Sequence, residues 1–219
     1  DGLGATVRAL RPDVILNAAA YTAVDRAESE PDLARRINAH APAALAREAA
    51  ACGALLVHYS TDYVFHGHGQ RPWAEDDPTG PLNVYGQTKL AGEQAIVQAG
   101  CRHLILRTSW VYAARGGNFA RTMLKLAAER EQLKVIADQF GAPTGADLLA
   151  DVSAHAIRRV REQPSLVGTY HCVADGETTW HAYARFVIEW ARARGHAIRV
   201  APEAILAVPT TEYPTPARR

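Results

Sequence analysis

The sequence has 219 residues, and its 24 lysine and arginine residues nearly balance 23 aspartate and glutamate residues, giving a formal net charge of +1. This balance argues against nucleic acid as a partner. Because 48% of the residues are hydrophobic and 21% are charged, the composition excludes intrinsic disorder as the main state. The longest apolar run, around residues 49–57, is far shorter than the roughly 20 residues that cross a bilayer, so we expect no membrane partner.

Short apolar runs alternate with helical patterns along the chain. Apolar runs that end at small or polar residues predict buried parallel strands at 13–17, 54–59, 103–108, 133–137 and 169–173. Helical spacing predicts helices at 41–52, 82–98, 119–130, 147–161 and 179–194, the first with Gly53 as its stop. A loop is predicted at 65–81, and a proline-punctuated extended segment at 208–216.

Strands separated by helices predict an α/β fold with a doubly wound, Rossmann-like parallel sheet, because parallel neighbours need helical crossovers. In such sheets ligands bind beyond the carboxyl ends of the strands. Three segments with candidate binding or catalytic residues each follow a predicted strand: 18–22, 60–65 and 108–112. We therefore expect all three to face one crevice.

Cysteine and histidine usage gives no sign of a metal site. Cys52, Cys101 and Cys172 are far apart and fit no paired metal-ligand spacing, which predicts reduced core thiols. The nine histidines show no ligand pair on one helix, so we predict no intrinsic catalytic metal. Three of these histidines are assigned to the surface or the core: His40, His58 and His171.

Tyr85 and Lys89 form the most specific chemical signal. Their spacing of four brings the phenol and the ammonium to one face of a helix. A phenol, with a pKa near ~10, is a poor proton shuttle at neutral pH unless a nearby cation stabilises its phenolate. Only Lys89, Lys125 and Lys134 are lysines among the 24 basic residues, which favours a chemical role for Lys89. An exposed helix pair without a role stays open as the alternative.

Thr61 and Asp62 lie directly after a predicted strand. Their hydroxyl and carboxylate groups can hydrogen-bond a carbonyl or hydroxyl group of a substrate in the crevice. Serine, threonine and aspartate also form turns, so residues 60–65 taken alone fit a turn equally well.

Five segments together carry a recognisable pattern: Ser60 to Phe65, Tyr85 to Glu93, Arg107 to Tyr112, Asp138 to Gly145 and Tyr213 to Arg219. In combination they resemble the dTDP-4-dehydrorhamnose reductase family, a branch of the extended short-chain dehydrogenase/reductase superfamily. The likeness runs from about Arg11 to the end of the chain. It implies an NADPH- or NADH-dependent reduction of the 4-keto group of dTDP-6-deoxy-L-lyxo-4-hexulose to dTDP-L-rhamnose, a precursor of bacterial surface polysaccharide, in the cytoplasm.

The resemblance implies a role for each motif residue. Tyr85 would donate a proton to the nascent alkoxide, and Lys89 would hold the nicotinamide ribose hydroxyls and depress the pKa of Tyr85. Thr61 would hydrogen-bond the keto oxygen or the Tyr85 hydroxyl, and Asp62 a sugar hydroxyl. The expected cofactor contacts are Ala19, Ala20, Tyr21 and Thr22, and the expected substrate contacts include Val24 and Trp110. Trp110 would present a flat apolar surface to the deoxysugar, with a core tryptophan as the alternative.

Single residues separate the neighbouring activities of this superfamily. Sugar-nucleotide 4,6-dehydratases carry an acid where this chain has Tyr63, and 4-epimerases usually have small residues near Asp62, so both activities are disfavoured. A non-catalytic, nicotinamide-binding regulatory subunit resembling the beta subunit of methionine adenosyltransferase stays open. The resemblance is also compatible with a homodimer and with Mg²⁺ at a subunit interface, neither of which the residues decide.

The resemblance further implies a dinucleotide-binding domain over residues 1–140 that lacks its first strands. Residues 141–219 would contribute a smaller substrate lobe and return to the main layer. An intact member opens with a strand and a glycine-rich turn that seats the pyrophosphate, and it continues beyond the final Pro-Ala-Arg-Arg. No strand precedes Gly2-Leu3-Gly4, and the chain stops at Pro-Ala-Arg-Arg, so we expect truncation at both ends. The motif residues are then present in a chain that is not expected to turn over substrate by itself. The residues that choose between NADH and NADPH would lie upstream.

Overall fold

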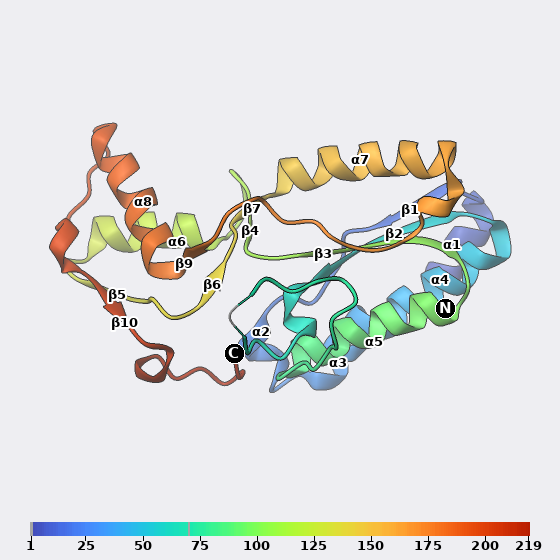
Figure 1. Ribbon diagram of the computed structural model, residues 1–219, viewed down its shortest axis with the longest axis horizontal. Helices are drawn as coiled ribbons and strands as arrows, with labels where there is room; N and C mark the ends of the chain where they lie inside the picture. The colour runs from blue at the N-terminus through green and yellow to red at the C-terminus, as the bar shows by residue number, and fades with distance from the viewer. Residues whose placement is uncertain (1, 70) are drawn as a thin grey trace. The chain divides into compact units, whose positions relative to one another are not determined.

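The computed structural model describes residues 2–69 and 71–219. Its helices, labelled in Figure 1, are α1 (Gly2–Leu10), α2 (Val24–Ala27), α3 (Pro31–Arg35), α4 (Ala41–Cys52), α5 (Val84–Gln98), α6 (Phe119–Glu129), α7 (Ala146–Glu162) and α8 (Trp180–Ala193). A π-helical turn, η1 (Arg36–His40), precedes α4, and short 3-10 turns are η2 (Asp62–Val64), η3 (Pro164–Leu166), η4 (Pro202–Ala204) and η5 (Thr210–Glu212).

The strands are β1 (Val14–Asn17), β2 (Leu55–Thr61), β3 (Arg102–Thr108), β4 (Val111–Tyr112), β5 (Leu133–Ile136), β6 (Phe140–Gly141), β7 (Thr144–Gly145), β8 (Gly168–His171), β9 (Thr178–Thr179) and β10 (Ile205–Val208). Two compact units contain these elements. The first unit comprises residues up to 108 together with 150–172 and 215–219, and the second comprises 109–149 and 173–214.

The first unit is built on a parallel sheet with strand order β1-β2-β3-β8. Side chains alternate along β2, so Leu56 packs with α1, α4 and α5 on one face, while Leu55 and Val57 pack with Val160 of α7 on the other. Figure 1 shows these helices on opposite sides of the sheet. The predicted doubly wound α/β fold is therefore confirmed, because helices cover both faces of parallel strands.

The second unit has its own core and smaller sheets. β5 and β10 pair in parallel, and residues of both strands pack against α6 and α8 through Ala127, Ile188 and Val200. β4 pairs with β7 in parallel, and β6 with β9 antiparallel. The units interleave along the chain because it leaves the first unit after β3 and returns to it with α7 and β8. This division differs from the sequential boundary expected at residue 140.

The main predicted elements lie within a few residues of the observed ones. The helix predicted at 41–52 is α4, and Gly53 ends it with a left-handed φ of 73°. Short elements were not predicted: α2, α3, η1, β4, β6, β7, β9 and β10. A strand of two residues has no measurable periodicity, which is why β4, β6, β7 and β9 left no signal in the sequence. Among the described residues, no helix combines the length and the apolar character needed to cross a membrane.

A buried ion pair ties α5 to β3. The Arg107 guanidinium donates to both carboxylate oxygens of Glu93, with a shortest N–O distance of 2.8 Å, and both side chains are less than a tenth exposed. Arg107 also donates to the carbonyl oxygen of Glu75 at 3.0 Å and lies 5.1 Å from the Phe65 ring centroid. The Glu75 carboxylate accepts the backbone N–H of His171 at 2.9 Å. Arg107 and Glu75 together thus fix the loop that follows η2 against β3 and β8.

We predict that Arg107→Met lowers the free energy of unfolding by about 3–5 kcal/mol, because it leaves the Glu93 carboxylate buried without its partner. Urea denaturation measures the change. Arg158→Met is the matched control, since Arg158 pairs with Glu162 on an exposed helix face and its loss should cost about 0.5 kcal/mol or less. Equal losses in the two variants would contradict the structural role of the buried pair.

Candidate active site

The candidate site lies at the carboxyl ends of the central strands of the first unit. The parallel register pairs Asn17 of β1 with His58 of β2, and Thr61 of β2 with Thr108 of β3. Residues 18–22 and the turn η2 therefore leave the same edge of the sheet. This edge is the expected ligand-binding edge of a doubly wound sheet.

Thr61 organises the turn that carries Asp62. Its hydroxyl oxygen accepts the backbone N–H of Tyr63 at 3.2 Å and its O–H donates to Asp62 Oδ1 at 3.0 Å. Burial raises the pKa of Asp62 to about 6, against the opposing effect of the Thr61 hydrogen bond. Residues 60–65 thus form the turn and also carry the polar groups, which combines the two alternatives that the sequence left open.

Helix α5 approaches this turn closely enough to bring Tyr85 to Thr61. Asn83 caps the helix, its Oδ1 accepting the Gly86 N–H at 2.8 Å. A Cβ on Gly86 would lie 2.2 Å from the Tyr63 carbonyl oxygen, so only glycine allows the contact. The Tyr85 ring meets the Tyr63 ring edge-on, with centroids 5.5 Å apart, and its hydroxyl lies beside the Thr61 side chain.

Burial raises the pKa of Tyr85 above its ordinary value. This direction is opposite to the lowering by Lys89 that the resemblance implied. The reason is geometric, since the Lys89 amine is held by groups of β2. Tyr85 is accordingly a protonated phenol at neutral pH, and it can donate a proton.

Lys89 is buried, with 1% of its surface exposed. Its Nζ donates to the Tyr59 carbonyl oxygen at 2.6 Å and lies 3.1 Å from Nε2 of His58. Burial lowers the pKa of Lys89 to about 8, although the nearby Glu93 carboxylate favours the charged form. The amine is therefore fixed in position and close to losing its proton.

His58 is a partner of Lys89 that the sequence did not identify. It was assigned to the surface or the core on sequence grounds, and it is completely buried. Its Nδ1 lies 2.9 Å from the Asn17 amide nitrogen, so it connects β1 to Lys89. A histidine inside a predicted strand carries no sequence signal that separates this role from simple packing.

Asn38 holds the segment 18–22. Its amide Oδ1 accepts the Tyr21 N–H at 2.8 Å, and its Nδ2 donates to the Tyr21 carbonyl at 3.0 Å. The Asn38 backbone in turn lies against Gly92 of α5, where a Cβ would be 2.2 Å from the Asn38 carbonyl oxygen. Asn38 was not predicted from the sequence, because its role depends on a π-helical turn that no sequence pattern indicates.

The other predicted contact residues of the first unit lie at or near its surface. Ala19 and Thr22 are exposed, whereas Ala20, Tyr21 and Val24 are partly buried. Val24 begins α2, and the Asp25 carboxylate that follows it accepts the Ala217 N–H at 3.2 Å.

Trp110 belongs to the second unit. Its ring stacks on Trp180 with centroids 3.4 Å apart, and a Cβ on Gly141 would lie 2.6 Å from the ring. Its backbone has a left-handed φ of 47°. The stacking on Trp180 gives part of the ring a packing role, while the residue remains only partly buried.

The residues at this edge fit a polar ligand that approaches the backbone. Ala18 and Ala19 are small and exposed after β1, which leaves the main chain accessible. Within the described residues, the buried hydroxyls of Ser60 and Thr108 have no hydrogen-bond partner. A buried polar group without a partner is unusual, and a bound water or ligand can supply the missing hydrogen bond. The accessible main chain at Ala18 and Ala19 and the hydroxyls of Ser60 and Thr108 suit the ribose and amide groups of a nicotinamide cofactor.

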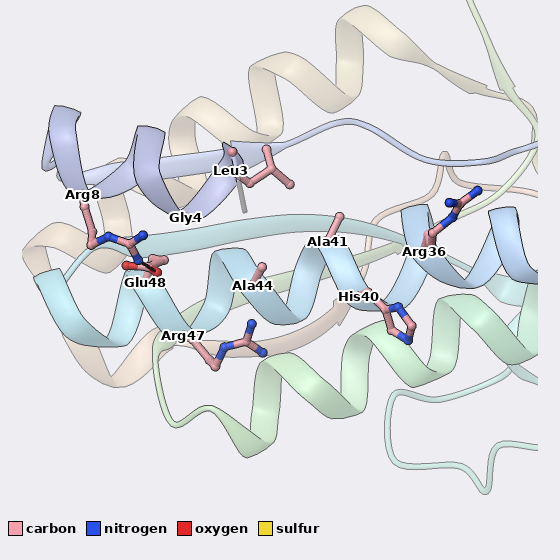
Figure 2. Close-up of a pocket in the computed structure, with 10 residues that line it drawn as sticks. Leu3, Gly4, Arg8, Arg36, His40, Ala41, Ala44, Arg47 and Glu48 are labelled. Atoms are coloured by element: carbon pink, nitrogen blue, oxygen red, sulfur yellow. Dashed lines mark hydrogen bonds and ion pairs between the residues drawn. The ribbon is translucent and has the colours of Figure 1, made fainter.

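Across residues 2–69 and 71–219, no cluster of three or more histidine, cysteine, aspartate or glutamate side chains could hold a metal ion. Figure 2 shows a separate hollow in the first unit between α1, η1 and α4. Arg8, Arg36, His40 and Arg47 line it, and Arg8 is paired with Glu48. The hollow contains none of the predicted site residues.

A family model described as RmlD substrate binding domain matches residues 1–219. The chain belongs to this family. It is 60% identical to the dTDP-4-dehydrorhamnose reductase of Escherichia coli K12 over 219 residues, which is all of this chain and 73% of the relative. At 40% identity it is also similar to the spore coat polysaccharide biosynthesis protein SpsK of Bacillus subtilis, covering 93% of this chain and 67% of that relative.

Solved structures agree with this membership. A dTDP-4-dehydrorhamnose reductase from Clostridium acetobutylicum matches 99% of this RmlD-family chain and 72% of its own, with 37% identity and a TM-score of 0.87. The Bacillus anthracis reductase in complex with NADP matches 99% of this chain and 73% of its own, with 38% identity and a TM-score of 0.86.

We predict that Asp62→Asn stabilises the protein by about 3 kcal/mol at pH 8, because folding raises the pKa of the carboxyl from 3.8 to about 6 and so disfavours its ionised form. A group with a raised native pKa stabilises fully below its unfolded pKa, and this contribution is lost as the pH rises through the native value. The difference between variant and wild type should therefore vanish below about pH 4. Urea denaturation across this pH range measures it, and a variant less stable at pH 8 would contradict the burial argument.

Proposed function

We propose that this protein reduces the 4-keto group of dTDP-6-deoxy-L-lyxo-4-hexulose to give dTDP-L-rhamnose, with a reduced nicotinamide cofactor as co-substrate. The observation that carries the proposal is the protonated Tyr85 hydroxyl beside Thr61, one helical turn from the buried amine of Lys89. The dTDP-4-dehydrorhamnose reductases to which the chain is similar support the substrate and disfavour the regulatory-subunit alternative. The Bacillus anthracis reductase was solved with NADP bound, which supports NADPH as the cofactor.

The chain's own residues supply the proton and the orientation. When bound, the nicotinamide cofactor supplies the hydride that adds to the carbonyl carbon. Tyr85 hydrogen-bonds the keto oxygen and transfers its proton as negative charge develops there. The Thr61 O–H, which donates to Asp62 in the ligand-free protein, turns to donate to the same keto oxygen. Because burial raises the pKa of Tyr85, the phenol carries its proton at neutral pH and the proton is present for transfer to the developing alkoxide.

Other residues hold the two ligands in the proposal. Lys89 holds the ribose hydroxyls of the cofactor, and the segment Ala19 to Thr22 contacts the cofactor with its backbone. Asp62 accepts a hydrogen bond from a sugar hydroxyl. Val24 and Trp110 contact the deoxysugar.

The function is tested by NADPH oxidation in the full-length protein that carries this sequence, given the dTDP-4-keto-6-deoxy sugar. Oxidation that depends on the keto sugar and is absent with dTDP-glucose supports the proposal. A folded protein that binds NADPH without oxidising it in the presence of the keto sugar would reject the reductase and favour a regulatory subunit.

We predict that Tyr85→Phe lowers kcat by about 10²- to 10⁴-fold while NADPH still binds, because the variant lacks the general acid. Tyr170→Phe is the control, since the Tyr170 hydroxyl donates to the Leu166 carbonyl on an exposed surface. NADPH binding by fluorescence and steady-state rates distinguish the two variants. A Tyr85→Phe rate near that of wild type would remove Tyr85 from the role of acid.

For Trp110→Ala we expect KM for the sugar nucleotide to rise roughly tenfold, the equivalent of about 1.4 kcal/mol of lost contact, with a smaller change in kcat. Trp190→Ala serves as the matched tryptophan variant, because Trp190 is an exposed residue of α8 stacked by Arg194. An unchanged KM in Trp110→Ala would leave only the packing role against Trp180.

A further inference from the structure

A chain of hydrogen bonds runs from the exposed segment after β1 to the buried amine of Lys89. The Ala19 N–H donates to Asn17 Oδ1 at 3.2 Å, and the Asn17 amide nitrogen lies 2.9 Å from His58 Nδ1. His58 Nε2 then lies 3.1 Å from Lys89 Nζ, which donates to the Tyr59 carbonyl at 2.6 Å. Asn17, His58 and Lys89 are all buried, so water has little access to these groups.

The direction of each hydrogen bond in this chain is fixed by the first one. Because Asn17 Oδ1 accepts the Ala19 N–H, the NH₂ group of Asn17 faces His58 and must donate to Nδ1. A neutral imidazole has one N–H, so the proton of His58 lies on Nε2. Burial lowers the pKa of His58 well below its usual range, which excludes the doubly protonated ring at neutral pH.

This arrangement places a donor, Nε2–H, against Lys89 Nζ. An ammonium group has three N–H bonds and no lone pair, so it cannot accept that hydrogen bond. A neutral amine can accept from His58 and still donate to the Tyr59 carbonyl. The hydrogen bonds from Ala19 to His58 are therefore those of an uncharged Lys89.

A charged Lys89 requires the opposite arrangement. Its ammonium would donate to a bare Nε2, and the His58 proton would move to Nδ1. Nδ1–H then needs an acceptor, so the Asn17 amide must turn its Oδ1 to His58, and the Ala19 N–H loses its partner. The ring nitrogens of His58 and the amide atoms of Asn17 exchange donor and acceptor roles together. A charged Lys89 and the hydrogen bond from the Ala19 N–H to Asn17 therefore exclude each other.

The charged groups around this network are few among the described residues. Glu93, on the same helix as Lys89, favours the ammonium form, but its carboxylate is bound by Arg107 of β3. Tyr85 lies one turn before Lys89, and Asp62 lies in η2, which packs against α5. None of these groups hydrogen-bonds Asn17 or His58, so none of them changes the donation from the Asn17 NH₂ group to His58 Nδ1.

We infer that His58 is a positioning residue for the reaction, which couples the charge of Lys89 to the hydrogen bond at Ala19 by exchanging its two neutral tautomers. A ligand oxygen that accepts the Ala19 N–H would free Asn17 to turn and would favour the ammonium form of Lys89. The role of Lys89 in the reaction rests on the proposed function. The coupling itself does not, because it is measured without substrate or cofactor.

The test is a pH titration of the ligand-free, full-length protein labelled with ¹⁵N in its histidine rings, followed by long-range proton–nitrogen NMR. The His58 signals are assigned by their loss in His58→Gln. Lys89 has a pKa of about 8, so the dominant His58 tautomer should change from Nε2–H above this pH to Nδ1–H below it. The same titration in Lys89→Met should show the Nε2–H tautomer throughout.

A single His58 tautomer across the titration of Lys89 in the wild type would overturn the inference, as would an imidazolium signal for His58 near neutral pH. The wild-type spectrum decides the matter even if Lys89→Met does not fold, because a merely structural His58 would keep one tautomer. Loss of NADPH oxidation in the separate reductase assay would contradict the proposed function and would leave this result unaffected.

Discussion

The position of the Lys89 amine is the constraint on which the candidate site depends. An alkylamine inside a protein is costly unless its N–H groups are satisfied, and here the Tyr59 carbonyl and the His58 ring supply the partners. Both partners belong to β2, so the contact fixes α5 against the central part of the sheet. Tyr85 lies one turn earlier on the same helix and is thereby held beside Thr61.

Two glycines of α5 make this approach possible. Gly86 and Gly92 leave no room for a Cβ, since it would lie 2.2 Å from the carbonyl oxygens of Tyr63 and Asn38. One helix therefore contacts both the turn after β2 and the segment near β1. The site also contains groups whose pKa values are shifted against folding: Asp62 upward and Lys89 downward. Such groups are typical of sites where chemistry is favoured over stability.

Much of this arrangement was predictable from the sequence because it depends on local spacing. The separation of Tyr85 and Lys89 and the position of Thr61 after a strand are properties of single elements. The long helices and the strands of the first sheet were equally accessible, since each has enough residues for its periodicity to show. The resemblance to a reductase family added the reaction, and the similar reductases support it.

The parts that escaped prediction depend on long-range contacts. The His58 ring meets Lys89 across 31 positions of the sequence, and Asn38 meets Thr88 across 50. The direction of the Tyr85 pKa shift was also missed, because it follows from burial and not from the distance to Lys89 along the helix. The resemblance implied that the chain returns to the main layer, but no local pattern records the residues at which it passes between the two units, which are 108, 149, 172 and 214.

Following the hydride tests the proposed reduction most directly. The full-length protein would be given NADPH carrying deuterium at C4 of the nicotinamide, on the face whose hydrogen is transferred, together with the dTDP-4-keto-6-deoxy sugar. We expect deuterium to appear at C4 of the sugar, in one dTDP-L-rhamnose for each NADPH consumed. Keto sugar recovered without deuterium, from protein shown to be folded and to bind NADPH, would contradict the reduction.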